Sequence, residues 1–431
     1  MTDDNSTNKE SIPSFSGFYK LTSEERLKKI QQYIPELTNE DISILLNTGS
    51  LDLDTTNRMV ENAVGTIAVP FGLAVNFIIN EKIYSVPMAI EEPSVIAASC
   101  NSAKLTLATG GFKASTTEQI MIGQIQILDL INHQEAVETI LANKEQILEI
   151  ANRSGKTMVA LGGGAKDVRA KIIETRVGKM VICELLIDCL DAMGANAVSS
   201  MAEIVSPFIE EITGGRVLLR ILSNLTDLRL AKASCVILKD QLGGDDIVDN
   251  IVAAAAFAET DPYRAATHNK GVMNGISAVI LATANDTRAI EAGAHAYAAK
   301  DGHYGSLTKW TKNENGDLIG SIEIPLAVGI IGGATKTNPV AQIALKIMRI
   351  KSASELAQVA VSVGLAQNLG ALRALATTGI IKGHMKLHSK NIAVAAGAVE
   401  DEIEIIAQKM IDENKVKYSR AVELLTEMKK K

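Results

Sequence analysis

Cysteine and aromatic residues are scarce in this chain of 431 residues, which contains four cysteines and 3% Phe, Trp and Tyr. The cysteines show no CxxC pairing and are not joined by histidines at zinc-ligand spacing, so neither a disulfide scaffold nor a metal site is expected. We expect reduced thiols that pack as small hydrophobic side chains. The four are Cys100, Cys183, Cys189 and Cys235.

The chain also lacks an excess of positive charge and a long apolar run. Its formal net charge is −7 at pH 7, which argues against nucleic-acid binding. The polar, acidic residues 1–5 do not form a secretory signal. The most apolar window, residues 65–79, is interrupted by Pro70, Gly72 and Asn76, and it is shorter than the roughly 20 apolar residues of a membrane span. We therefore expect a cytoplasmic protein that binds neither nucleic acid nor membrane.

Small aliphatic side chains are abundant instead, and residues 118–223 have the pattern of a self-contained unit. Ile125 and Ile127 alternate with glutamines as in a strand, and Gln134–Asn152 is amphipathic. Further strands are expected at 168–172, 180–190 and 217–222, and a helix at 196–213. This βαββαβ order is that of a ferredoxin-like domain. The glycines at 162–164 lack the GxGxxG spacing of a Rossmann fingerprint.

The expected fold class is α+β, with a helix-rich large domain, the inserted ferredoxin-like domain and a small C-terminal helical unit. Thr22 predicts the start of an N-terminal helix. Residues 224–378 are predicted to be mostly helical, with β-like pieces near 318–331. Gly379 and Gly383 are candidate hinges, so the last unit is expected to move as a flap. The domains are 1–117 and 224–378 (large domain), 118–223 (inserted domain) and 379–431 (flap).

Two adjacent carboxylates, Glu91 and Glu92, lie in the otherwise apolar stretch 86–98, bracketed by Pro87 and Pro93. An ionised carboxylate is rarely placed among apolar neighbours without a partner or a purpose, because desolvating it is costly. A carboxyl group there would keep its proton more readily than in water, as a general acid near neutral pH requires. The alternative is a surface loop with two solvated glutamates. The segment by itself leaves both possibilities open.

Four other segments carry side chains suited to catalysis or binding. Lys270 lies on a glycine-flanked backbone just ahead of an apolar helix, where it is either an oxyanion ligand or a surface lysine. Asp286 is either a helix N-cap or a functional acid. His384, at the supposed hinge, is either structural or a proton donor. The backbone amides that follow Asp191, between a strand and a helix, suit a phosphate.

Seven segments together resemble the 3-hydroxy-3-methylglutaryl-CoA (HMG-CoA) reductases, and they span essentially the whole chain. The expected absence of a membrane anchor, the inserted domain and the flap resemble the class II, prokaryotic form of this family. The segments are ENAVG at 61–65, EEPS at 91–94, DAMGAN at 191–196, HNKGVMNG at 268–275, GGATKT at 332–337, AQNLGA at 366–371 and GHMKLH at 383–388.

The resemblance implies the four-electron reduction of (S)-HMG-CoA to (R)-mevalonate and CoA, through a hemithioacetal and mevaldehyde, in isoprenoid biosynthesis. It implies four catalytic residues. Lys270 would stabilise the thioester oxyanion, His384 would protonate the departing CoA thiolate, and Glu92 would supply a proton to the alcohol. Asp286 would join Lys270 and Glu92 in one coupled network. Glu91 would then be a bystander.

The same resemblance implies residues that bind the substrate and the cofactor. Arg264 suits the substrate carboxylate because its planar guanidinium can bind both oxygens, while Gln367 and Lys20 match contacts to CoA. The substrate-binding residues implied are Lys20, Ser94, Arg264, Asn274, Gln367 and Asn368. The cofactor-binding residues implied are Arg153, Lys156, Asp191, Met193, Gly194, Asn196 and Asn224.

Residues 152–156 bear on the choice of nicotinamide cofactor. Relatives that prefer NADH carry an aspartate here, where it can hold the ribose 2′-hydroxyl. This chain has two cations and no acid, Arg153 and Lys156 being the cations. We therefore expect NADPH to be preferred, with NADH still possible.

The resemblance also implies at least a homodimer, because the family builds its active sites from both subunits. Two alternative functions stay open. The same enzyme could run in the oxidative direction, on mevalonate as a carbon source. A non-catalytic acyl-CoA-binding protein is disfavoured by the presence of all four catalytic matches.

Overall fold

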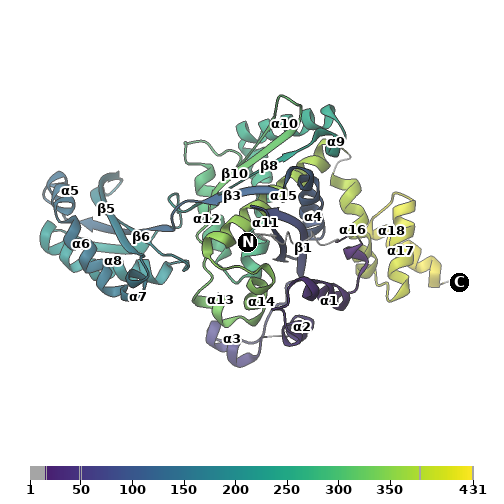
Figure 1. The fold of residues 1–431 in the computed structure, drawn as a ribbon, viewed down its shortest axis with the longest axis horizontal. Coiled ribbons are helices and arrows are strands. Elements are labelled where there is room, and N and C mark those ends of the chain that lie inside the picture. Colours follow the sequence, from purple (N-terminus) through teal and green to yellow (C-terminus); the bar gives the residue numbers. More distant parts are fainter. Residues whose placement is uncertain (1–14, 16, 48, 50, 378–379, 430–431) are drawn as a thin grey trace, which may run out of the picture.

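The computed structural model describes residues 15, 17–47, 49, 51–377 and 380–429, without the side chains of residue 19 and residues 380–387. It has a central body, a lobe built on a separate sheet and a C-terminal group of helices on the opposite side (Figure 1). The helices of that group are α16 (Ile380–Ala395), α17 (Asp401–Asp412) and α18 (Tyr418–Lys429).

The central body is built on a six-stranded sheet in the order β2-β1-β3-β8-β10-β9. Every neighbouring pair is antiparallel except β1 and β3. The strands are β1 (Phe71–Ile79), β2 (Lys82–Ala89), β3 (Phe112–Thr116), β8 (Leu230–Ile237), β9 (Thr308–Lys312) and β10 (Leu318–Pro325). The lobe is inserted between β3 and β8, which are paired neighbours, so the insertion leaves the central core continuous.

The main apolar core lies between this sheet and three helices, α4 (Val95–Thr106), α11 (Pro262–Ala282) and α15 (Ala353–Ala376). Glycines allow α11 and α15 to pack closely. A Cβ added at Gly275 would stand 2.9 Å from Cβ of Gln367, and one at Gly364 would stand 2.6 Å from Cγ1 of Ile276. Backbones approach so closely only where no side chain intervenes.

Helix α15 also explains the one candidate membrane span among the described residues. It is long and apolar enough to cross a membrane by length and composition, but 67% of its apolar window is buried inside the structure. Helix α15 is therefore a core helix of the central body.

The lobe is a four-stranded, fully antiparallel sheet in the order β5-β6-β4-β7, covered by helices that enclose a second core. Its elements are β4 (Ile120–Leu128), α5 (His133–Ala142), α6 (Lys144–Ser154), α7 (Lys156–Ala160), β5 (Gly164–Thr175), β6 (Gly178–Asp188), α8 (Ala195–Thr213) and β7 (Arg216–Leu222). The single helix expected at 134–152 is two helices. They meet at Asn143, whose side chain donates to the Thr139 carbonyl at the end of α5.

The N-terminal segment packs against the central body through a smaller apolar cluster. Thr22 begins α1 as predicted, because its hydroxyl accepts the Glu25 N–H in a capping box. The elements are η1 (Phe18–Lys20), α1 (Ser23–Tyr33), α2 (Asn39–Leu46) and α3 (Leu53–Met59). The remaining elements of the body are η2 (Leu107–Thr109), α9 (Lys239–Leu242), α10 (Asp245–Thr260), α12 (Thr287–Ala298), α13 (Gly333–Thr337) and α14 (Pro339–Met348).

The mostly helical expectation for residues 224–378 holds for most of that range but misses β8 and β9. The β-like piece near 318–331 is β10, and the two helical patterns near the C-terminus are α17 and α18. Strand β8 was missed because it lies in a range that is Ala/Gly-rich and mostly helical. Pairing with β3 and β10 in the middle of the sheet supplies the order that its sequence does not signal. The hinge expected at Gly379 lies outside the described residues.

Candidate active site

Glu92 lies in the loop between β2 and α4. Strand β2 is buried over its last six residues, and the loop that follows brings the chain back toward solvent. Ser94, at the N-cap of α4, has a φ of 78°, in the left-handed region that is unfavourable for a residue with a Cβ. Such local strain is concentrated at functional sites. Glu91 is exposed, whereas the Glu92 side chain is 32% exposed.

Lys270 lies in the middle of α11, so the expectation that it precedes a helix is wrong. The helix begins at Asp261, whose carboxylate accepts the Arg264 N–H, and Pro262 occupies its first turn. Gly271 and Gly275 resemble loop residues in sequence because glycine has a low helix propensity. Packing of α11 against α15 overrides that propensity.

The structure brings Glu92, Lys270 and Asn274 together. Nζ of Lys270 is 2.7 Å from Oε2 of Glu92, and Nδ2 of Asn274 donates to the same oxygen at 3.3 Å. The lysine and asparagine are one turn apart on α11 and share a face. An ion pair whose side chains are 60% and 32% exposed adds at most about 1 kcal/mol to stability. The fold does not need this pair, and the lysine keeps two further N–H donors for a ligand oxygen.

Arg264 lies six residues before Lys270 on α11 and is a second cation near the site. Burial lowers the pKa of its half-buried guanidinium. Within the part of the chain that the structure describes, this guanidinium makes no hydrogen bond or ion pair. A half-buried guanidinium whose N–H groups are not already bonded is suited to an incoming carboxylate.

Asn368 and Gln367 lie behind the site on α15, buried and bonded within the protein. Oδ1 of Asn368 accepts from Oγ1 of Thr308 at 2.9 Å and from Nε1 of Trp310 at 2.7 Å. Oε1 of Gln367 accepts from Oγ of Ser99 at 2.9 Å. Neither expected substrate contact is exposed in this structure, where they are 1% and 6% exposed.

His268 adjoins Asn368 in this buried layer. Nε2 of His268 lies 3.1 Å from Nδ2 of Asn368 and 2.6 Å from Oγ1 of Thr308. Burial and the nearby Arg264 cation lower the pKa of His268 to about 4. The imidazole is therefore neutral at physiological pH, and its Nε2 belongs to one buried hydrogen-bond network with Asn368 and Thr308.

Asp286 is the N-cap of α12, as one of its two interpretations predicts. Its carboxylate accepts the N–H groups of Arg288 and Ala289 at 3.0 and 3.1 Å. In the described part of this single chain it makes no contact with Lys270 or Glu92. Twelve residues separate Lys270 from the end of α11, or about 18 Å at 1.5 Å per residue, and Asp286 follows that end.

The catalytic histidine implied by the resemblance, His384, lies in α16, but its side chain is outside the described residues. His388 lies one turn later on the same helix and is half-buried. Among the described residues, no group of three or more His, Cys, Asp or Glu side chains could hold a metal ion.

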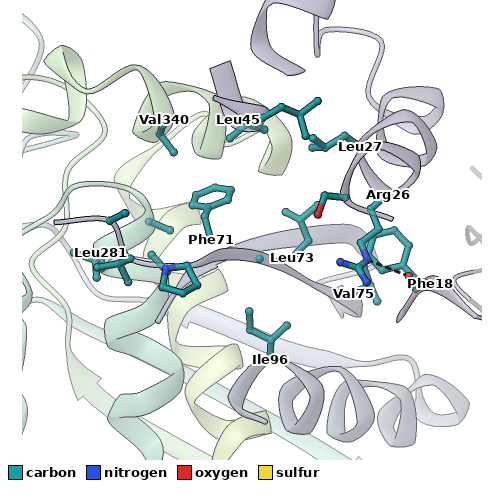
Figure 2. A pocket seen from close by; sticks show the side chains of 18 of the residues that line it. Phe18, Arg26, Leu27, Leu45, Phe71, Leu73, Val75, Ile96, Leu281 and Val340 are labelled. Carbon is teal, nitrogen blue, oxygen red and sulfur yellow. Dashed lines mark hydrogen bonds between the residues drawn. The ribbon is translucent and has the colours of Figure 1, made fainter. Parts of the chain in front are cut away.

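A cavity of about 1450 Å³ joins two of the expected substrate contacts, Lys20 and Ser94. Figure 2 shows its mainly apolar wall, formed by side chains such as Phe71 and Ile96. Arg26 contributes a guanidinium whose Nε donates to the Phe18 carbonyl at 3.2 Å. Sequence reasoning missed Arg26 and a further lining cation, Lys104, because neither lies in a recognisable motif.

The expected cofactor residues 191–194 form the loop between β6 and α8. Oδ1 of Asp191 accepts the N–H of Ala353 at 2.7 Å, at the first turn of α15. The loop's carbonyls at Ala192 and Met193 accept from Nη1 of Arg229, at 3.1 and 3.0 Å. Sequence reasoning did not select Arg229, because no motif surrounds it.

The other expected cofactor residues are exposed around the same lobe. Arg153, at the end of α6, pairs with Glu149 at 3.0 Å, whereas Lys156, at the start of α7, makes no ion pair or hydrogen bond within the described residues. Asn196 lies in the first turn of α8, and Asn224 lies on the connection from β7 to β8; both are exposed.

Comparison with known proteins gives a consistent family. The family model described as "Hydroxymethylglutaryl-coenzyme A reductase" matches residues 22–389. A 3-hydroxy-3-methylglutaryl-coenzyme A reductase of Archaeoglobus fulgidus is 52% identical over 413 residues, which cover 96% of this chain and 94% of the relative. A probable reductase of the same name from Borreliella burgdorferi is 36% identical over 396 residues, 88% of each chain.

Solved structures agree with these sequence relatives. A 3-hydroxy-3-methylglutaryl-coenzyme A reductase from Streptococcus pneumoniae superposes with a TM-score of 0.83 at 38% identity, covering 96% of this chain and 100% of that chain. A class II reductase from the same organism, bound to NADPH in open conformations, gives a TM-score of 0.81 at 38% identity, covering 95% and 100%. The family inferred from the seven sequence segments is confirmed: the chain belongs to the hydroxymethylglutaryl-coenzyme A reductase family.

Proposed function

We propose that this protein reduces (S)-HMG-CoA to (R)-mevalonate and free CoA, in the mevalonate pathway of isoprenoid biosynthesis. The reaction consumes two reduced nicotinamides and two protons. The observation that carries the proposal is the contact between Lys270 and Glu92, made across 178 positions of sequence in a member of this family. The contact pairs an oxyanion-stabilising cation with a carboxyl group that can move a proton.

Lys270 and Glu92 divide the chemistry between them. Two N–H donors of Lys270 remain for the thioester oxygen, where negative charge develops as hydride arrives. Glu92, hydrogen-bonded to Lys270 and Asn274, is placed to return a proton to that oxygen when the alcohol forms. The nicotinamide supplies hydride when it is bound.

His384 and Asp286 complete the proposed catalytic set. His384 would protonate the CoA thiolate as it leaves, because an unprotonated thiolate can add back to the aldehyde. Asp286 would act on Lys270 from a second copy of the chain. Lys270 lies about 18 Å from the C-terminal end of α11, at 1.5 Å per residue. Asp286 follows that end, and this separation within one chain supports a contact made by a second copy.

The substrate would lie between the catalytic pair and the large cavity. Arg264 is suited to its carboxylate, and the cavity that reaches Ser94 is suited to the CoA portion. Lys20 lies at the same cavity as Arg26 and Lys104, a group of cations that could meet phosphates. Gln367 and Asn368 are proposed to contact the substrate only after local rearrangement, because both are now bonded internally.

We propose that residues 118–223 form a ferredoxin-like, non-Rossmann domain that holds the nicotinamide cofactor. The antiparallel sheet order β5-β6-β4-β7 supports this topology. Two features fit a dinucleotide phosphate: the loop 191–194 opens the 19-residue helix α8, and Lys156 is an exposed cation whose amine is not paired with the described residues. The second feature favours NADPH over NADH, and NADPH preference favours the reductive direction over mevalonate oxidation.

The chain is further proposed to act as a cytoplasmic homodimer whose C-terminal unit, 379–431, closes as a flap. The extended segment 60–69 supports the dimer, because it exposes apolar side chains that a monomer would leave in water. Val64 is 99% exposed and Ile67 is 95% exposed.

The experiment that tests the function is NADPH oxidation by the purified protein with and without HMG-CoA. We expect HMG-CoA-dependent oxidation, and its loss by at least about a thousandfold in Lys270→Ala and Glu92→Gln. Lys309→Ala, an exposed lysine on β9, is the control and should keep wild-type turnover. Binding of HMG-CoA without turnover in the wild type would favour the non-catalytic acyl-CoA-binding alternative. Unchanged turnover in either active-site variant would overturn the role of that residue.

A further inference from the structure

Arg229 is a buried cation that lies beneath the loop 191–194. It is 1% exposed and sits just before β8, where the chain returns from the lobe to the central sheet. Its guanidinium donates to four oxygens on three segments. Nη1 reaches the carbonyls of Ala192 and Met193, Nη2 reaches the Val328 carbonyl at 2.5 Å, and Nε reaches Oε1 of Gln119 at 3.0 Å.

None of these partners is a carboxylate, and no ion pair to Arg229 is found among the described residues. Burying a cation without a counter-ion costs several kcal/mol even when its hydrogen bonds are satisfied. Burial lowers the pKa of Arg229 to about 10, so the group still carries its charge at neutral pH. The nearby charges of Asp188 and Asp191 act in the opposite sense to burial on this pKa, so Arg229 is a buried cation with two carboxylates in its surroundings and no direct ion pair to them.

The same loop is fixed from its other side by Gly329. A Cβ added there would stand 2.5 Å from the backbone N of Met193, so the two backbones are in direct contact. The N–H of Ile330 donates to the Asp191 carbonyl at 3.0 Å, and the N–H of Gly329 donates to Oδ1 of Asn285 at 2.7 Å. Asn285 directly precedes Asp286. One connected set of contacts thus runs from the loop to the start of α12.

Hydrogen bonding to Ala192 and Met193 also affects the amides of the loop. A peptide carbonyl that accepts a charged donor polarises the N–H of the following residue. The N–H groups affected belong to Met193 and Gly194, at the N-terminus of α8. The buried charge and the polarised amides favour an anion at the loop, against the opposing charges of Asp188 and Asp191.

We infer that Arg229 is a positioning residue for the dinucleotide: it holds the loop 191–194 in place and supplies the positive charge beneath it that favours the cofactor's diphosphate. This inference rests on the proposed function, because it takes NADPH as the ligand of the lobe. Arg229 does not touch the reacting atoms. It acts through the backbone of the loop, with Gly329 as the second support.

The test compares dissociation constants for NADPH and HMG-CoA in Arg229→Lys and Arg229→Gln, with the melting temperature measured alongside. Lysine keeps the charge but reaches fewer acceptors, so we expect NADPH binding to weaken about tenfold in Arg229→Lys and about a hundredfold in Arg229→Gln. Affinity for HMG-CoA should stay within about twofold of wild type. A purely structural arginine would weaken both ligands together, and either that result or unchanged NADPH affinity would overturn the inference.

Gly329→Ala and Arg220→Gln complete the design. Should the Arg229 variants fail to fold, Gly329→Ala displaces the same loop from its other side and must weaken NADPH binding selectively; if it does not, the inference is wrong. Arg220 is an exposed arginine of β7 in the same lobe, and its variant should bind both ligands as wild type does. Absence of NADPH binding in the wild type would instead contradict the proposed function, and with it this inference.

Discussion

Glu91 and Glu92 are neighbours in sequence but have different surroundings in the structure. Glu91 is exposed, whereas Glu92 accepts from Lys270 and Asn274 on α11. The apolar residues on either side of them belong to two elements, the buried end of β2 and the start of α4, and both carboxylates lie in the loop between. The pair is therefore one functional candidate with a solvated neighbour. Sequence spacing alone could not separate them, because the partners of Glu92 come from a distant helix.

Lys156 is the residue at which the cofactor preference can be tested. The amine is exposed and unpaired within the described residues, in contrast to Arg153, which already pairs with Glu149. We expect Lys156→Glu to lower kcat/KM for NADPH at least about tenfold and to leave kcat/KM for NADH within about twofold, because only NADPH carries a 2′-phosphate.

Steady-state kinetics with both cofactors check this expectation. Lys166→Glu, an exposed lysine of β5 in the same lobe, controls for the general effect of an added negative charge. A tenfold preference of the wild type for NADH would contradict the proposed cofactor.

Packing between α11 and α15 decides where Lys270 is held. Lys270 depends on the path of α11, and that path depends on contact at Gly275, where an added Cβ would stand 2.9 Å from Cβ of Gln367 and from the Val363 carbonyl oxygen. Four residues earlier, at Gly271, the nearest atom to an added Cβ is 3.9 Å away. The same substitution should therefore have opposite effects at the two glycines.

We expect Gly275→Ala to destabilise the protein by about 1–3 kcal/mol through overpacking. Gly271→Ala should be neutral or stabilising by up to about 1 kcal/mol, because alanine has the higher helix propensity. Thermal unfolding followed by circular dichroism measures both, and each variant is the control for the other. A higher melting temperature for Gly275→Ala than for Gly271→Ala would contradict the close packing.

Asp41 joins α2 to α14 and should make the N-terminal segment sensitive to acid. Burial opposes its ionisation, but the hydrogen bonds from Lys346, 2.6 Å away, and from Thr38 outweigh burial and place the pKa of Asp41 below its ordinary value. A carboxyl group whose pKa is lowered by folding contributes stability above its unfolded pKa of about 3.9, and that contribution is lost as the pH falls through the folded value.

The variant Asp41→Asn should therefore melt at a lower temperature than wild type at pH 7, with a cost of about 1–2 kcal/mol. The difference between the two proteins should shrink as the pH falls below about 4. Glu40→Gln, next to it on the exposed side of α2, should show no such difference. A gap that widened toward low pH would contradict the assigned interaction.

At the scale of the whole molecule, the exposed segment 60–69 is where the proposed homodimer can be tested. Val64→Asp places a charge at a side chain that is 99% exposed in the single chain, so it should cost little in a monomer but much in an interface. We expect the wild type to elute as a dimer, and the variant to elute as a monomer with little turnover.

Light scattering coupled to size-exclusion chromatography measures the mass of each species. Val177→Asp, in the exposed turn of the lobe at 71% exposure, is the control and should remain dimeric. A wild-type monomer with full activity would contradict both the dimer and the proposed reach of Asp286 from a second copy.

Sequence by itself determined the family and most features that depend on local chemistry. Thr22 predicted the start of α1, the strands expected at 168–172 and 180–190 are β5 and β6, and the helix expected at 196–213 is α8. Such signals lie within a few residues of each other, so they can be read along the chain. The proposed catalytic residues were predicted in the same way, from short motifs that resemble a known family.

Tertiary structure alone decided what those residues touch. It placed Lys270 inside a helix, brought Glu92 to it across 178 positions, and put Arg229 beneath a loop of the lobe. It also ordered β8 between two strands. These outcomes depend on packing between segments far apart in sequence, where close contact at glycines and the burial of apolar faces outweigh local propensity. A sequence pattern carries information about the residues next to it, whereas an active site is built from several segments that are distant in sequence.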